Sequence, residues 1–230
     1  YTEEKDRAVL LVVDQRLNMF FGTRDRLKSV TAAQLAALGA WRALDVGDRV
    51  GIVAFDDETL FELPPRRSEQ NVMSILNGVL EMNHALHAES GVHPAPGMLN
   101  TALEKAMRLA KHDMLVVIVS DFFGDDEQTS KLTARISTHN DILGILVHDP
   151  MRLDPPTGRL RASDGENQLE MDLGDRKLRE RLVEDYRDEQ ERIARFLRRL
   201  SAPLLMISNE GDVVSQVRRL LGVAPVPNNG

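Results

Sequence analysis

The chain has 230 residues, of which 42% are hydrophobic and 28% are charged, so a soluble protein with a substantial core is expected. It contains no cysteine, which excludes disulfides, zinc–thiolate sites and thiol catalysis. The formal net charge of −7 opposes attraction to phosphate backbones, and we therefore expect no nucleic-acid partner.

The apolar runs are far shorter than the roughly 20 residues that a helix needs to span a bilayer, so we expect no membrane segment in this chain. We expect a cytoplasmic location. Because the sequence begins at Tyr1 rather than at a methionine, a signal or an anchor upstream stays open.

Five short runs rich in valine, isoleucine and leucine predict strands that are buried on both faces of a mainly parallel sheet. The predicted strands are Ala8 to Asp14, Arg49 to Phe55, Met114 to Asp121, Ile142 to His148 and Leu204 to Ser208. Between them, apolar residues at helical spacing predict helices. These helices cover residues 27–44, 72–86, 99–109 and 126–138.

The segment before the last strand has a different pattern. Residues 154–173 contain prolines, glycines and two short alternating runs, GRLRAS and NQLEMDL, which predict an inserted β-hairpin. A long charged helix with one apolar stripe follows at residues 175–200. We therefore predict one doubly wound α/β domain over residues 1–222, with helices on both faces of the sheet, and a flexible tail at residues 223–230.

Two of the predicted strands end in an aspartate, Asp14 and Asp121. Doubly wound sheets bind ligands at the carboxyl ends of the strands, where the strand order reverses. If the two strands are neighbours there, the two carboxylates converge on one crevice. Such a pair suits Mg²⁺, which is usually held by one or two carboxylates together with other oxygen ligands and waters.

The sequence resembles a known family in these same segments. The runs DQRLNMFFGT, GDRVGIVAF and MLVVIVSDFFGDD resemble the von Willebrand factor A-like domain of the domain of unknown function 58 family. The hairpin, the long helix and the run PLLMISNEGDVVSQVRRLL also fit, so the resemblance covers nearly the whole chain. It implies a bacterial protein that works beside a MoxR-type AAA+ ATPase in assembling or maturing other proteins.

The resemblance also implies a metal-ion-dependent adhesion site, built from an aspartate and two serines, a threonine, and a second aspartate. Asp14 and Asp121 match the two aspartates, but Arg16 and Asn18 stand at the serine positions and Gly97 lies near the threonine position. A guanidinium carries donors only and cannot ligate a cation.

Two orientations of Arg16 stay open. Pointing into the crevice, it places its own charge where the metal would lie and gives an aspartate a bidentate partner. Pointing to solvent, it leaves Asp14, Asn18 and Asp121 able to hold Mg²⁺ weakly through water. We predict that the metal site is lost and that no cofactor is required, with Mg²⁺ as the alternative.

Two pairs of aromatic residues follow the two aspartates. Adjacent residues do not easily both face inward, so we expect one phenylalanine of each pair to pack in the core and the other to be available to a partner. The predicted partner-binding crevice consists of Asp14, Arg16, Asn18, Phe20, Phe21, Gly97, Asp121 and Phe122.

Other groupings have simpler explanations. Asp125 and Asp126 could extend the carboxylates into a two-metal site, but acids that precede a helix more commonly cap it. His84, His87 and His93 lack a fourth ligand at matching spacing and are expected on the surface. No nucleophile motif is present.

We therefore predict a non-catalytic protein-interaction module whose partners are proteins, including a MoxR-type ATPase. The alternatives are a functional Mg²⁺- or Mn²⁺-dependent adhesion site that binds an acidic residue of a partner, and a metal-dependent hydrolase.

Overall fold

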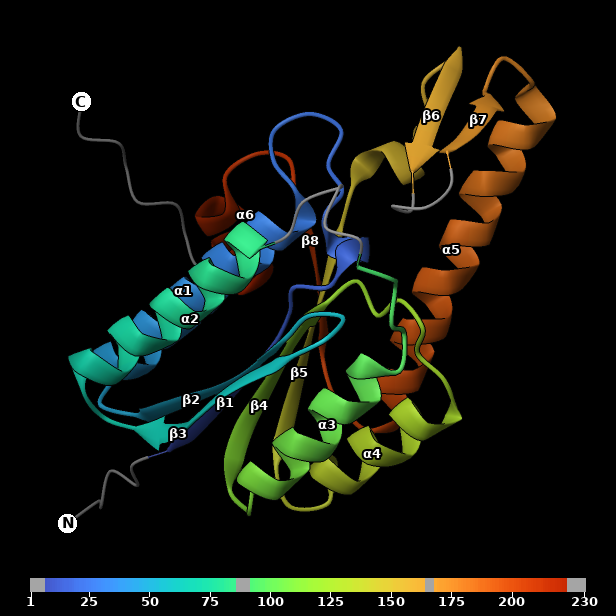
Figure 1. The fold of residues 1–230 in the computed structure, drawn as a ribbon. Coiled ribbons are helices and arrows are strands. Elements are labelled where there is room, and N and C mark those ends of the chain that lie inside the picture. Colours follow the sequence, from blue (N-terminus) through green and yellow to red (C-terminus); the bar gives the residue numbers. More distant parts are fainter. Residues whose placement is uncertain (1–6, 86–91, 164–167, 223–230) are drawn as a thin grey trace.

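A computed structural model describes residues 7–85, 92–163 and 168–222, and the side chains among them outside residues 159–172 (Figure 1). A six-stranded sheet forms the centre, in the order β3-β2-β1-β4-β5-β8. Every neighbouring pair is parallel except β2 and β3. The strands are β1 (Ala8–Asp14), β2 (Arg49–Phe55), β3 (Leu60–Arg66), β4 (Met114–Ser120), β5 (Asp141–His148) and β8 (Leu204–Ser208). The five predicted strands are confirmed.

Strand β3 was not predicted from the sequence. It contains Pro64 and Pro65, which cannot donate to a sheet ladder, and a pattern of alternating apolar residues is absent. These prolines are tolerated because β3 lies at the edge of the sheet and pairs only with β2. Opposite them, a Cβ atom at Gly51 would lie 2.6 Å from the carbonyl oxygen of Leu63, so glycine permits this close approach.

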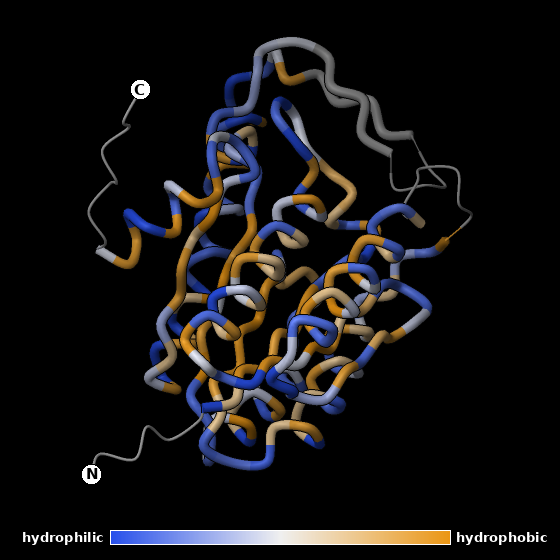
Figure 2. The backbone as a smooth tube through the Cα atoms, turned by 90° about the vertical axis from the view of Figure 1, so that its left-hand side faces the viewer, coloured by the Kyte–Doolittle hydropathy of each residue, from blue (hydrophilic) through white to orange (hydrophobic). Residues whose placement is uncertain are grey.

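Helices cover both faces of the sheet, as the sequence predicted (Figure 1). One face carries α1 (Lys28–Asp45), α2 (Glu69–Ala85) and α6 (Val213–Leu220). The other face carries α3 (Met98–Leu109), α4 (Glu127–Ser137) and α5 (Arg176–Arg199). Successive residues of the central strand β1 enter the two cores in turn, with Leu10 on the α3 side and Leu11 on the α1 side. Figure 2 shows hydrophobic segments running through this central layer.

The predicted hairpin is confirmed as the antiparallel pair β6 (Arg159–Ser163) and β7 (Gln168–Asp172), which lies near the start of α5 (Figure 1). The short turns η1 (Leu17–Met19) and η2 (Pro150–Arg152) follow β1 and β5. Among the described residues, no helix combines the length and hydropathy that a membrane span requires. The predicted tail at 223–230 lies outside the described residues.

Helix α5 is attached to the sheet by a narrow apolar stripe. Its buried residues are Tyr186, Ile193 and Leu197, while most of its other side chains are charged. Leu197 packs against Gly144 of β5, where an added Cβ would lie only 2.5 Å from a Leu197 methyl carbon. The attachment of α5 therefore depends on a few close apolar contacts.

We expect Leu197→Ala to lower the free energy of unfolding by about 2 to 5 kcal/mol, because the truncation leaves a cavity between α5 and the sheet. Urea denaturation followed by circular dichroism measures the change. The matched control is Leu221→Ala at a residue that is 59% exposed, where the change should stay below about 0.5 kcal/mol. Equal losses in the two variants would contradict this packing.

Candidate functional site

The two strand-end aspartates lie at the same end of two neighbouring strands, which is the arrangement on which their convergence depended. Strands β1 and β4 are neighbours; Asp14 is the last residue of β1 and Asp121 directly follows β4. From β1 the chain crosses over α1 to β2 on one side, whereas β4 lies on the other side. The strand order therefore reverses between β1 and β4, which is where such sheets form binding crevices.

Arg16 points into this crevice and pairs with Asp14. Its Nε donates to Asp14 Oδ1 at 3.0 Å and its Nη2 donates to Oδ2 at 2.7 Å, so the contact is bidentate. Both side chains have an exposed fraction of 0%. The Ser120 hydroxyl donates to the same Asp14 Oδ2 at 2.6 Å, and the Arg16 Nη1 donates to the carbonyl of Pro96 at 3.1 Å. Of the two orientations that the sequence allowed, the inward one is found.

Arg16 stays charged in this buried position. Burial by itself lowers the pKa of Arg16, but the charge and the hydrogen bonds of Asp14 raise it, as do the charges of Asp121 and Asp57, and the net direction is upward. The guanidinium carbon also lies 5.3 Å from the centre of the Phe55 ring, at cation–π distance. A permanent internal cation therefore lies beside Asp14.

A second internal cation neutralises Asp121. Lys28 Nζ donates to Asp121 Oδ2 at 2.5 Å, and both side chains are less than one tenth exposed. The other oxygen, Oδ1, accepts from the Asn18 amide at 2.7 Å and from the backbone N–H of Phe123 at 2.9 Å. Burial tends to raise the pKa of Asp121, but the charge of Lys28 and these hydrogen bonds outweigh it and lower the pKa to about 2.

Asp57 is a third buried carboxylate at the crevice that the sequence reasoning missed. It accepts from the backbone N–H of Leu17 at 2.5 Å and from that of Ala95 at 2.7 Å. It therefore ties the loop after β1 to the loop before α3. Lys28 and Ser120 were also missed. A search for every polar residue at a strand end would have found Ser120 and Asp57.

The loops around the crevice are locked together at Gly124. Its φ of 78° lies in the left-handed region, and an added Cβ would lie 2.4 Å from the Cβ of Pro96. Glycine therefore lets the loop after β4 lie directly against the loop before α3. Gly97, the residue near the threonine position of the resemblance, is exposed at the start of α3 and offers no side-chain ligand.

In the second aromatic pair one phenylalanine is in the core and the other is exposed, as expected, but the buried one is Phe122, which was predicted to line the crevice. Phe122 is only 2% exposed and packs in the core on the α3 side, so it does not line the crevice as predicted. Its neighbour Phe123 is 43% exposed and takes that place at the rim. Phe20 and Phe21 are both half-buried, so neither is fully inside as one was expected to be.

The other acidic residues and histidines that the sequence singled out do not join the crevice where the structure describes them. Asp126 caps α4 by accepting from the Thr129 N–H at 2.8 Å, as predicted, but Asp125, for which capping was also expected, instead pairs with Arg192 of α5. His84 and His93 are exposed, as expected, and His87 lies outside the described residues.

A family model described as a protein of unknown function, DUF58, matches residues 1–192. The chain belongs to this family. No curated protein matches the sequence significantly.

Solved structures share the fold of this DUF58 chain at low sequence identity. The conserved hypothetical protein BatB from Bacteroides thetaiotaomicron has a TM-score of 0.55 and 13% identity, covering 94% of this chain and 97% of that chain. An aerotolerance-related membrane protein from Bacteroides fragilis has a TM-score of 0.53 and 14% identity, covering 92% of this chain and 95% of that chain. The SpRpn10 VWA domain has a TM-score of 0.51 and 12% identity, covering 96% of this chain and 98% of that chain. The DUF58 chain therefore has the von Willebrand factor A-like fold that the resemblance implied.

The donor set of this DUF58 chain does not fit the adhesion metal that the resemblance implied. All four carboxylate oxygens of Asp14 and Asp121 already accept hydrogen bonds, and each residue is paired with a cation. Asn18 directs an N–H, not an oxygen, at Asp121. Mg²⁺ needs free oxygen ligands in near-octahedral geometry. Within the described residues, no three His, Asp or Glu side chains are grouped to hold a metal.

We expect Arg16→Ser to lower the free energy of unfolding of this DUF58 chain by about 3 to 5 kcal/mol, because Asp14 then carries an unpaired buried charge. Chemical denaturation measures the loss. Arg24→Ser is the matched control, since Arg24 is 73% exposed and its pair with Glu210 should contribute less than about 1 kcal/mol. A loss below about 1 kcal/mol for Arg16→Ser would contradict the buried pair.

We also expect the stability of this DUF58 chain to fall between about pH 4 and pH 2. The folded pKa of Asp121 is about 2, below the value near 3.9 of an unfolded aspartate, so its stabilising charge is present above pH 4 and is lost as the pH falls through the folded pKa. Asp121→Asn removes this titration and should show a shallower fall when denaturation is measured at each pH. Parallel curves for the two proteins would contradict the assignment.

Proposed function

We propose that this chain is a non-catalytic protein-interaction module in which Arg16 and Lys28 replace the adhesion metal. The observation that carries the proposal is the buried bidentate contact between Arg16 and Asp14. The contact between Lys28 and Asp121 places a second internal cation beside the other aspartate. In this proposal, the two positive charges hold the crevice loops in place without any exchangeable ion.

A partner of such a module contacts the rim of the crevice and not its centre. The Arg16 guanidinium is fully buried and cannot be reached unless the loops open. The rim offers exposed or half-buried groups with mixed chemistry, as interfaces usually do. These are Asn18, Phe20, Phe21, Gly97 and Phe123.

The family resemblance supports a bacterial setting with a MoxR-type AAA+ ATPase as a partner in assembling or maturing other proteins. BatB and the aerotolerance-related membrane protein share the fold of this chain, which is compatible with a role as an interaction domain in a larger assembly. The proposed partner surface is the rim around Phe123.

The proposal is tested by the binding of the purified MoxR-type ATPase from the same organism, measured with and without EDTA. We expect binding that EDTA leaves unchanged and that Phe123→Ser weakens about tenfold, since an exposed aromatic anchor at an interface contributes roughly 1 to 2 kcal/mol. Trp41→Ser is the matched control, because Trp41 is 42% exposed and Phe123 is 43% exposed.

Three outcomes would overturn parts of the proposal. Equal effects of the Phe123 and Trp41 variants would remove the rim as the partner surface. Saturable Mg²⁺ or Mn²⁺ binding at sub-millimolar metal that Asp14→Ala abolishes would restore the adhesion site. Turnover of phosphoester substrates that disappears in Asp121→Asn would indicate a metal-dependent hydrolase.

A further inference from the structure

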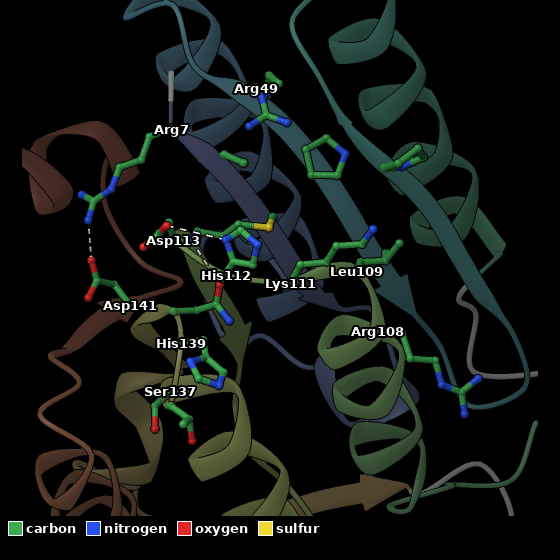
Figure 3. Close-up of a pocket in the computed structure, with 16 residues that line it drawn as sticks. Arg7, Arg49, Arg108, Leu109, Lys111, His112, Asp113, Ser137, His139 and Asp141 are labelled. Atoms are coloured by element: carbon green, nitrogen blue, oxygen red, sulfur yellow. Dashed lines mark hydrogen bonds and ion pairs between the residues drawn. The ribbon is translucent and has the colours of Figure 1, made fainter. Parts of the chain in front are cut away.

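A second concave surface lies at the opposite end of the sheet, where β1, β2, β4 and β5 begin (Figure 3). This groove has a volume of about 1040 Å³ and is open to solvent. Its walls come from segments that are far apart in the sequence, including the ends of α3 and α4. It shares no residue with the crevice around Asp14.

The groove is basic although the chain as a whole is acidic. The chain has 36 Asp and Glu residues against 29 Lys and Arg residues. In the groove the balance is reversed, and two imidazoles add further donors. The charged and imidazole side chains that line it are Arg7, Arg49, Arg108, Lys111, His112, Asp113, His139 and Asp141.

The carboxylates of the groove are already engaged. Arg7 pairs with Asp141 at 2.5 Å along one side. Asp113 lies 3.6 Å from the His112 ring nitrogen. Figure 3 shows both contacts as dashed lines.

Two of the cations have no such partner. The side chains of Arg108 and Lys111 form no ion pair with any residue that the structure describes, and both residues are exposed. In the view of Figure 3, Lys111 lies between Arg49 and Arg108. Within the part of the chain that the structure describes, the groove therefore presents two positive charges without an ion-pair partner.

Helix ends explain only part of this charge. Arg108 lies in the last turn of α3 and Lys111 just beyond it, where cations complement the helix dipole. Arg7 directly precedes β1 and Arg49 is the first residue of β2, so neither belongs to the last turn of a helix. The cations of the groove therefore come from two strand starts and from the end of α3.

We propose that this groove binds an acidic polypeptide segment of a partner protein. Guanidinium groups pair with carboxylates in bidentate geometry, and Arg108 offers such a group close to the ammonium of Lys111, whereas Arg7 is already paired with Asp141. Salt limits the attraction of each exposed cation to roughly 8 Å at physiological ionic strength, so only the carboxylates of a partner that lie along the groove contribute to binding. A long nucleic-acid strand would instead run onto the acidic remainder of the surface.

This surface is independent of the crevice rim proposed above. The groove lies at the amino ends of the strands and the crevice at their carboxyl ends, so the domain can engage two partners at once. A change in the rim should leave the groove intact, and the reverse should also hold.

The test uses the full chain and a fluorescein-labelled octaglutamate peptide, with fluorescence anisotropy as the readout. We expect saturable binding that weakens as salt is raised and that falls at least about tenfold in Arg108→Gln/Lys111→Gln. The matched control, Arg218→Gln/Arg219→Gln on α6, changes the net charge equally at exposed residues and should retain binding. Phe123→Ser should also retain binding, which separates this proposal from the rim.

Several results would overturn the proposal. Equal losses in the Arg108/Lys111 and Arg218/Arg219 variants would mean that the peptide senses net charge and not the groove. Comparable binding of an octaglutamine peptide would exclude charge recognition. Tighter binding of an eight-nucleotide oligothymidine than of octaglutamate would assign the groove to nucleic acid.

Discussion

The buried ion pair between Asp14 and Arg16 fixes the loops at the carboxyl end of the sheet. A carboxylate removed from water needs a cation or several hydrogen-bond donors, and for Asp14 the cation is only two residues along the same chain. To reach it, the chain turns sharply after β1 and places Arg16 Nη1 against the Pro96 carbonyl. This contact is one of several that hold the loop before α3, together with the bond from Ala95 to Asp57 and the close approach of Pro96 to Gly124.

The same principle recurs at the ends of the other parallel strands. Each buried aspartate there accepts hydrogen bonds from the loops around it. Asp57 joins the loop after β1 to the loop before α3. Asp149, after β5, accepts from Thr23 and from Asn209, which joins the loop before α1 to the turn after β8. Burial tends to raise the pKa of Asp149, but these hydrogen bonds lower it, so its charge is retained.

A network of this kind gives the crevice a fixed shape. The loop after β1, the described part of the loop before α3 and the loop after β4 each donate a backbone hydrogen bond to a carboxylate, and such a bond is about twice as strong as a neutral one. Under the proposed function, such rigidity presents the rim to a partner at little cost in conformational entropy. The opposite end of the sheet has exposed and partly unpaired charges, which suits recognition by long-range electrostatics. The two ends thus differ in physical character as well as in sequence.

The sequence by itself determined the layered architecture and the position of Asp14 and Asp121 at strand ends, whereas the pairing of β1 with β4 that brings the two residues to one crevice came from the structure. Continuous apolar strands need helices on both faces, and parallel strands bring their carboxyl ends to one edge. It did not determine β3, because prolines are read as strand breakers and only its place at the sheet edge makes them acceptable. It also left the orientation of Arg16 open and misplaced Phe122.

Only the tertiary structure decided these last points. Whether Arg16 faces solvent or Asp14 depends on Ser120, Pro96 and Phe55, which come from three distant parts of the chain. The basic groove likewise exists only because strand starts and helix ends meet there. Periodicity in a sequence reports which face of an element is buried, but the partner of a buried charge is set by long-range packing.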